Sequence, residues 1–218
     1  MEKTKKAYKK IAKKDLDEVI KILSDEYKDA VCGLNYTSPL SLTISLILAA
    51  QCTDARVNEI APILLNKYPD VYSLSEADII DIENIIYPCG FYKSKAKSIK
   101  LCSKKIIDEF DRIVPCTMED LTSLAGIGRK SANIILQECF NITVGIAVDT
   151  HVTRISRKIG ITNSKTQELI EKDLMKKIPK IYWNKINHIL VNHGRKYCIA
   201  NRPNCTSCPI NNLCKKND

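Results

Sequence analysis

Four cysteines lie close together near the end of the sequence, and their spacing indicates a metal site. The pattern C-x6-C-x2-C-x5-C is formed by Cys198, Cys205, Cys208 and Cys214. Structural zinc sites usually contain two C-x2-C pairs, whereas this segment has one. Soft thiolate ligands also suit an iron–sulfur cluster. The spacing favours a [4Fe–4S] cluster, with a zinc ion and uncoordinated thiols as the alternatives.

The remaining six cysteines are far apart in the sequence. They are Cys32, Cys52, Cys89, Cys102, Cys116 and Cys139. The basic start of the chain, MEKTKKAYKKIAKK, has no apolar segment of the kind that a signal peptide requires. We therefore expect a cytoplasmic protein whose thiols stay reduced, without a disulfide framework. These six cysteines are predicted to be small buried apolar residues.

A glycine turn in the sequence LTSLAGIGRKSANIIL separates two predicted helices. Thr117 and Asp120 predict a capped start for the first helix. Gly126 and Gly128 allow a tight turn, and the second helix is expected to begin near Arg129. Backbone N–H groups at such a turn can bind a phosphate oxygen without reading base sequence. The alternative is an ordinary turn between two packed helices.

Two titratable residues lie at predicted helix starts, and each has both a chemical and a non-catalytic interpretation. Lys130 falls in the first turn after the glycines, where the helix dipole opposes a cation. A neutral amine there could attack a substrate and form a Schiff base, whereas a charged one could bind phosphate. Asp149, after an apolar strand-like run, could cap the next helix, assist proton transfer, or do both.

Apolar residues recur at helical spacing along most of the chain, so an all-α fold is predicted. Helices are expected at 15–28, from Pro39 through a buried apolar run, from a cap at Thr53 or Asp54, and at 94–110, 163–178 and 182–197. Pro62 is expected to kink its helix. The net charge of +9 is compatible with a nucleic-acid partner or with a merely soluble surface, and no apolar run is long enough to span a membrane.

Taken together, these motifs resemble the endonuclease III family of base-excision-repair DNA glycosylases. The resemblance covers about 16–214 and rests on LILAAQCTD, GFYKSKA, LAGIGRKSAN, VDTH, HGRKYC and the cysteine spacing. It implies a two-lobed all-α helix-hairpin-helix glycosylase fold. One lobe, a six-helix barrel, would span 33–142 and include the hairpin at about 117–136. The other would combine 1–32 with 143–218 and hold the [4Fe–4S] cluster in the loop 198–214.

The resemblance also assigns roles to individual residues. Lys130 and Asp149 match the catalytic lysine and aspartate, and the four clustered cysteines match the cluster ligands. The residues expected to contact DNA are Gln51, Phe91, Gly126, Gly128, Arg129, His151 and Arg202. Phe91 stands where the bacterial family often has leucine, and an aromatic wedge can still stack between bases. Ala125 and Ser131 depart mildly from the family's usual proline and threonine.

The implied activity is that of a bifunctional DNA glycosylase and AP lyase. It would act as a monomer, near the nucleoid, on double-stranded DNA that contains oxidised pyrimidines or abasic sites. One alternative is a monofunctional, adenine-type mispair glycosylase, which typically lacks the lysine and carries an extra C-terminal domain. Another is a non-catalytic DNA-binding module with a structural metal.

Overall fold

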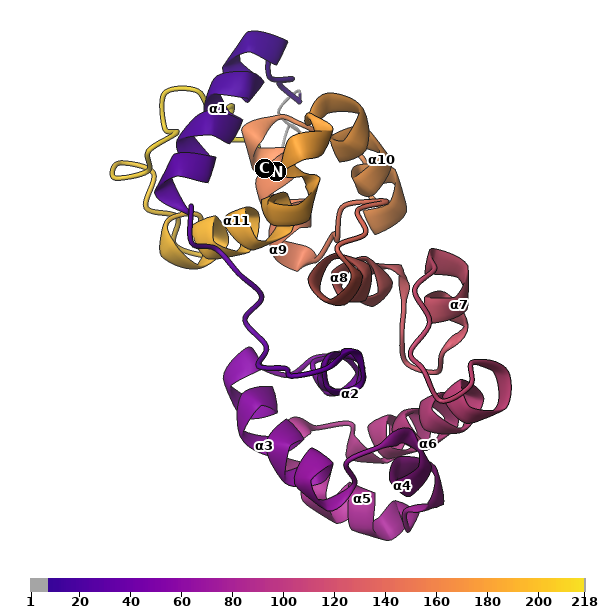
Figure 1. Cartoon of the computed structure of the whole chain (residues 1–218). Helices are drawn as coiled ribbons and strands as arrows, with labels where there is room; N and C mark the ends of the chain where they lie inside the picture. Colours follow the sequence, from indigo (N-terminus) through magenta and orange to yellow (C-terminus); the bar gives the residue numbers. More distant parts are fainter. Residues whose placement is uncertain (1–7, 218) are drawn as a thin grey trace. The chain divides into compact units, whose positions relative to one another are not determined.

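The computed structural model describes residues 8–217, and all the regular elements in this range are helices (Figure 1). The all-α prediction is therefore confirmed for the described part of the chain. Residues 1–7, which include part of the basic N-terminal run, lie outside it. The chain divides into two compact units, Cys32–Val144 on the one hand and Met1–Val31 with Gly145–Asp218 on the other. These divisions fall beside the expected boundaries at 32/33 and 142/143.

The unit Cys32–Val144 is a set of short helices around one central helix. It contains α2 (Pro39–Leu48), α3 (Asp54–Lys67), α4 (Val71–Glu76), α5 (Ile79–Ile86), η1 (Tyr87–Cys89), α6 (Tyr92–Glu109), α7 (Met118–Ser123) and α8 (Arg129–Phe140). Helix α2 packs against α3, α6 and α8, and its residues from Ser41 to Leu48 are all buried. The predicted central helix is thus confirmed, with Ser38 as its N-cap and Pro39 in its first turn.

The second unit is built from the two ends of the chain. It contains α1 (Lys13–Glu26), α9 (Thr150–Ile159), α10 (Gln167–Lys177), η2 (Lys180–Tyr182) and α11 (Trp183–Lys196). Helix α11 packs against both α1 and α9, and a shared apolar core joins all four α-helices. The segment after α11, which carries the four clustered cysteines, is held to this core by Ile210, which is 1% exposed.

The described chain ends are fastened to each other within this unit. The side chain of Asn217 accepts a hydrogen bond from the Lys9 amide at 2.9 Å and donates one to the Lys9 carbonyl at 2.7 Å. Nearby, the Ile11 amide donates to the Gly160 carbonyl at 3.1 Å. The N-terminal segment, the end of α9 and the end of the cysteine segment therefore form one connected edge.

One sequence expectation needs correction in the helices. The helix predicted to begin at Asn163 begins at Gln167, because the Thr166 side chain accepts the Leu169 amide and caps it there. Helix α3 is continuous from Asp54 to Lys67 and contains Pro62, and the kink expected there stays a prediction. Pro62 is exposed, so water can take the place of the hydrogen bond that its missing N–H cannot make. None of the helices among the described residues combines the length and apolar character needed to span a bilayer.

Candidate functional site

The glycine turn forms a helix-hairpin-helix in which the first helix is closely capped. The Thr117 hydroxyl accepts the Asp120 amide at 3.1 Å and donates to the Asp120 carboxylate at 2.7 Å, as the capping pattern predicted. Helix α7 ends at Ser123 with Leu124 as its C-cap, and the Ile127 amide donates to the Leu124 carbonyl at 3.1 Å. Helix α8 then begins at Arg129 with Gly128 as its N-cap.

The two glycines of this turn have different physical roles. Gly126 has a φ of +83°, and a Cβ placed on it would lie 3.1 Å from Ser98 Cβ and 3.2 Å from Ile47 Cγ1. This position therefore needs glycine both for its backbone conformation and for its packing. Gly128 has an ordinary φ of −94°, and a Cβ placed on it would meet no heavy atom within 4 Å. Nothing in the protein itself requires glycine there, and the start of α8 is open to a ligand.

Lys130 occupies the second position of α8, directly after this open turn. It is half-buried, and it lies within electrostatic range of the Cys32 thiol in the same unit. Burial raises the pKa of Cys32, and the positive charge of Lys130 acts in the opposite direction. A lysine at the first turn of a helix has its cation opposed by the helix dipole.

Asp149 is the N-cap of α9, and this predicted role is confirmed. Its Oδ1 accepts a hydrogen bond from the Val152 amide at 2.8 Å. The apolar run before it was expected to be strand-like, but it is a buried connection without strand partners among the described residues. The buried side chain of Asn187 holds this connection by donating to the Ala147 carbonyl at 2.8 Å. Asp149 is therefore fixed from both sides, by its helix and by α11.

Gln51 and Phe91 stand at exposed loop tips with strained backbones. Their φ angles are +53° and +47°, in the left-handed region that non-glycine residues rarely adopt. Phe91 is 66% exposed, which is unusual for so large an apolar side chain. Strained residues of this kind persist only where the surrounding structure holds them, and they are common at functional sites.

A buried lysine holds the two loops that carry these residues. Lys95, on α6, is 4% exposed, and its Nζ donates to the Leu48 carbonyl and to the Cys89 carbonyl, each at 2.8 Å. Leu48 ends the helix before Gln51, and Cys89 precedes the Gly90–Phe91 turn. Burial lowers the pKa of Lys95, while the nearby thiols of Cys52 and Cys89 act to raise it.

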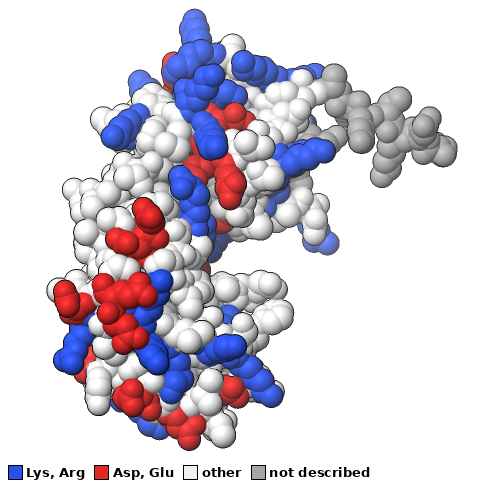
Figure 2. All heavy atoms as spheres, turned by 90° about the vertical axis from the view of Figure 1, so that its right-hand side faces the viewer, with Lys and Arg blue, Asp and Glu red and all other residues white. Residues whose placement is uncertain are grey.

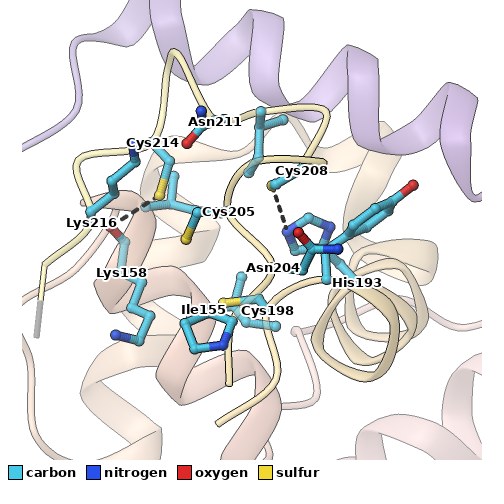
Figure 3. Close-up of a pocket in the computed structure, with 14 residues that line it drawn as sticks. Ile155, Lys158, His193, Cys198, Asn204, Cys205, Cys208, Asn211, Cys214 and Lys216 are labelled. Carbon is cyan, nitrogen blue, oxygen red and sulfur yellow. Dashed lines mark hydrogen bonds between the residues drawn. The ribbon is translucent and has the colours of Figure 1, made fainter. Parts of the chain in front are cut away.

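The four clustered cysteines line a common cavity of about 60 Å³ (Figure 3). Cys208 Sγ lies 3.7 Å from His193 Nε2, and Cys214 Sγ donates to the Lys158 carbonyl at 3.5 Å. Across residues 8–217, no three His, Cys, Asp or Glu side chains are grouped closely enough to bind one metal ion. Four thiols around a shared space suit a cluster in which each thiolate binds a different iron atom. The residues present could therefore hold a [4Fe–4S] cluster.

The surroundings of this cavity are apolar and favour neutral side chains. Burial raises the pKa values of the Cys198, Cys208 and Cys214 thiols. Burial also lowers the pKa of His193 to about 4, so its imidazole is neutral near pH 7. The guanidinium of Arg154 donates to the Cys198 carbonyl at 2.9 Å and fixes the first cysteine to α9.

His151 packs between α9 and α11. Its Nδ1 lies 3.2 Å from a guanidinium nitrogen of Arg154, and a Cβ on Gly194 would approach that Nδ1 to 2.6 Å. The glycine of the HGRKYC motif therefore permits close contact between the two helices. Arg202 lies in the cysteine segment and is exposed.

On the face drawn in Figure 2, Lys and Arg side chains are interspersed with groups of Asp and Glu. On this face, basic side chains are therefore not gathered into one continuous patch.

The expectation that the six isolated cysteines are buried is only partly correct. Cys89 and Cys102 are buried, whereas Cys32, Cys52 and Cys139 are half-buried and Cys116 is exposed. All ten cysteines are present as free thiols. Sequence reasoning also missed the supporting roles of Lys95, Arg154 and Asn187, because each depends on contacts with backbone carbonyls that are distant in sequence.

An all-helical chain with a glycine hairpin turn leading into a helix that bears a lysine has the features of the helix-hairpin-helix DNA glycosylases. The model of the HhH-GPD superfamily of base excision DNA repair proteins matches residues 44–180. Endonuclease III of Synechocystis is 43% identical to this chain over 197 residues, and the alignment covers 90% of each protein. Endonuclease III of Bacillus subtilis is 36% identical over 204 residues, 93% of each chain.

The fold agrees equally well with a solved structure. A trapped endonuclease III–DNA covalent intermediate superposes with a TM-score of 0.91 and 34% identity, over 95% of this chain and 97% of that one. The chain belongs to the endonuclease III family of the HhH-GPD superfamily of base excision DNA repair proteins. The resemblance found in the sequence motifs is thereby confirmed.

Substituting serine separately at Gly126 and Gly128 is expected to separate stability from DNA binding. Gly126→Ser should lower the free energy of unfolding by about 1–3 kcal/mol, because of its left-handed backbone and close packing. Gly128→Ser should stay within about 0.5 kcal/mol of the wild type, since serine caps helices well and the site is open. Its hydroxyl would nevertheless compete with a phosphate for the amides of α8, so affinity for duplex DNA should fall.

Denaturant unfolding and fluorescence anisotropy with an undamaged duplex provide the two measurements. Equal DNA affinity for wild type and Gly128→Ser would exclude this turn from phosphate contact.

Proposed function

We propose that this enzyme is a bifunctional DNA N-glycosylase and AP lyase that removes oxidised pyrimidines from duplex DNA and cuts 3′ to the abasic site. The observation that carries the proposal is the place of Lys130, in the first turn of α8 directly after an open glycine turn. A covalent protein–DNA intermediate has been trapped for a related endonuclease III. An adenine-type monofunctional glycosylase would not need an amine nucleophile at this position.

DNA would bind largely through its backbone. The first amides of α8 have no partner within the helix, and Gly128 leaves them accessible, so they suit a phosphate oxygen. Arg129 and Arg202 are exposed and could add charge to such contacts. His151 would act from the start of α9. Backbone contacts of this kind position the duplex without selecting a sequence.

The damaged nucleotide would leave the helix before the reaction. Extrusion costs a few kcal/mol, and a damaged base lowers that cost. Gln51 and Phe91 would fill the space that the extruded base leaves, because both stand at exposed tips and Phe91 offers a ring for stacking. The strain at both residues would keep the two side chains directed outward.

Lys130 would supply the nucleophile. Its neutral amine would form a bond to C1′ of the sugar while the bond to the base breaks, and the base would leave with the bonding electrons. The C1′–O4′ bond of the sugar would then break, with a proton passing from the lysine nitrogen to O4′, and the imine formed in this way would make the C2′ proton acidic. Loss of that proton would expel the 3′ phosphate and cut the strand, after which water would release the enzyme.

Asp149 would serve two purposes with one carboxylate. Its Oδ1 caps α9 and keeps the group oriented. The negative charge would help to remove a proton from Lys130 and would stabilise the positive charge that develops on the sugar. The capping and the chemical role are compatible, because the cap engages Oδ1 and leaves the carboxylate oriented by α9.

Cys198, Cys205, Cys208 and Cys214 would hold a [4Fe–4S] cluster. When bound, such a cluster supplies four strong thiolate bonds that order the segment 198–214 and thereby present Arg202. The lobes would correspond to a six-helix barrel at 33–142 and a cluster lobe formed by 1–32 with 143–218. The enzyme would act as a monomer and would be found at the nucleoid, where its substrate lies.

The activity is tested with two labelled duplexes, one containing thymine glycol and one containing an abasic site. Wild-type protein should release the damaged base and cut both duplexes 3′ to the lesion, leaving the product of β-elimination. Lys130→Gln should bind the duplexes but cut neither. Intact abasic strands after treatment with the wild-type protein would refute the lyase proposal, and base release without cutting would indicate a monofunctional enzyme.

Asp149→Asn should separate the cap from the charge. Asparagine also caps helices, so the variant should match the wild type in thermal unfolding and in DNA affinity. Its single-turnover rate of base release should fall about a hundredfold or more, the scale of a positioned acid–base group. A rate equal to that of the wild type would leave Asp149 as a cap alone.

The cysteine site is tested by composition and colour. Protein prepared without oxygen should contain iron and acid-labile sulfide and absorb broadly near about 400 nm. Cys205→Ser should lower the iron content and weaken DNA binding, while the unit Cys32–Val144 keeps its helical content. Stoichiometric zinc without sulfide would contradict the cluster.

A further inference from the structure

Two cysteines that the proposed chemistry does not use lie together beneath the loops of Gln51 and Phe91. The Cys52 thiol acts electrostatically on the Cys89 thiol, and both thiols act on the buried amine of Lys95. Their backbones are brought together by Lys95, whose Nζ binds the Leu48 and Cys89 carbonyls, each at 2.8 Å. In the loop that carries Gln51, the Cys52 amide donates to the Ala49 carbonyl at 3.2 Å, so the chain turns directly after α2.

The two thiols differ in accessibility, which would give them different parts in an oxidation. Cys52 is half-buried and reachable from solvent, whereas Cys89 is 2% exposed. The positive charges of Lys95 and Arg56 both act to lower the pKa of Cys89. Burial, followed by the proximity of Cys52, nevertheless raises the pKa of Cys89 to about 11, so Cys89 is a protonated thiol near pH 7.

We propose that Cys52 and Cys89 form an oxidation-sensitive pair that closes to a disulfide and locks the two loops that carry Gln51 and Phe91. The oxidant is a peroxide. The Cys52 thiolate attacks one peroxide oxygen, which gives a sulfenic acid and, with a proton, water. The Cys89 sulfur then attacks the Cys52 sulfur, forms the disulfide and releases a second water. Two thiols and one hydrogen peroxide thus become one disulfide and two waters.

The bond would change how the loops meet DNA. Gln51 precedes Cys52 directly, and Phe91 follows Cys89 by two positions. Both residues are held in left-handed conformations, so the loops have little freedom to absorb a new covalent constraint. The disulfide is therefore expected to slow base release from a duplex, which needs both loops. It should not affect cutting at an abasic site in a single strand, which needs no base extrusion.

The first measurement is the bond itself. Cluster-containing wild-type protein is treated with limiting hydrogen peroxide, alkylated and digested with trypsin without reduction. Arg56 and Lys67 lie between the two cysteines, so they fall in separate peptides. A linked peptide lighter than the two parents by two hydrogens should appear and should vanish with dithiothreitol. Cys52→Ser and Cys89→Ala should each abolish it, whereas Cys116→Ser, which removes an exposed thiol, should not.

The second measurement is activity, and this part rests on the proposed function. Oxidised wild type should release thymine glycol from a duplex about tenfold more slowly, a modest effect for a small displacement of positioning groups. Dithiothreitol should restore the rate, and Cys52→Ser given the same peroxide should keep it. The absorbance of the cluster is followed in every sample. Loss of the cluster would lower the rates of wild type and Cys52→Ser alike, whereas the disulfide would lower only the rate of the wild type.

The outcomes distinguish this inference from the proposed function. Absence of the linked peptide, or linkage of Cys52 to a different cysteine, would overturn the inference while base release by the reduced enzyme still stands. A linked peptide with an unchanged duplex rate would overturn the locking of the loops. A protein that forms the linked peptide but never releases a base would instead refute the proposed function.

Discussion

The placement of Lys130 depends on how Gly126 packs. Gly126 takes a left-handed conformation, and a Cβ on it would come within 3.1 Å of Ser98 and 3.2 Å of Ile47. The turn thereby packs closely against Ser98 of α6 and against Ile47 of the buried central helix α2. Helix α8 starts three residues after Gly126, so its first turn inherits a fixed position. A reactive amine needs a fixed position of this kind, because a displacement of about 1 Å can lower the reaction rate a hundredfold.

The same principle, polar groups fixed by backbone contacts, is found in the rest of the described chain. Lys95 is buried with its amine on two carbonyls, and it holds two strained loops together. Asn187 donates a hydrogen bond to the Ala147 carbonyl, and Arg154 donates one to the Cys198 carbonyl. Buried polar groups are costly unless they are hydrogen-bonded, so these side chains fix the backbone conformations that expose other residues.

The features that the sequence predicted well are local ones. The caps at Thr117 and Asp149, the central helix α2 and the hairpin turn follow from a few adjacent residues and their periodicity. The errors have tertiary causes. The expected burial of Cys116 is wrong, because its exposure depends on a loop that hydropathy does not place. The contacts of Lys95 join carbonyls distant in sequence, which no local pattern reveals.

The central claim is that the amine of Lys130 bonds to the sugar, and borohydride trapping tests it most directly. Borohydride reduces the imine to a stable crosslink, so wild-type protein with an abasic duplex should give a covalent adduct that peptide mapping assigns to Lys130. Lys130→Arg keeps the charge, but a guanidinium stays protonated and cannot form the imine, so it should trap as little DNA as Lys130→Gln. Normal trapping by Lys130→Arg, or an adduct on a different lysine, would contradict the account.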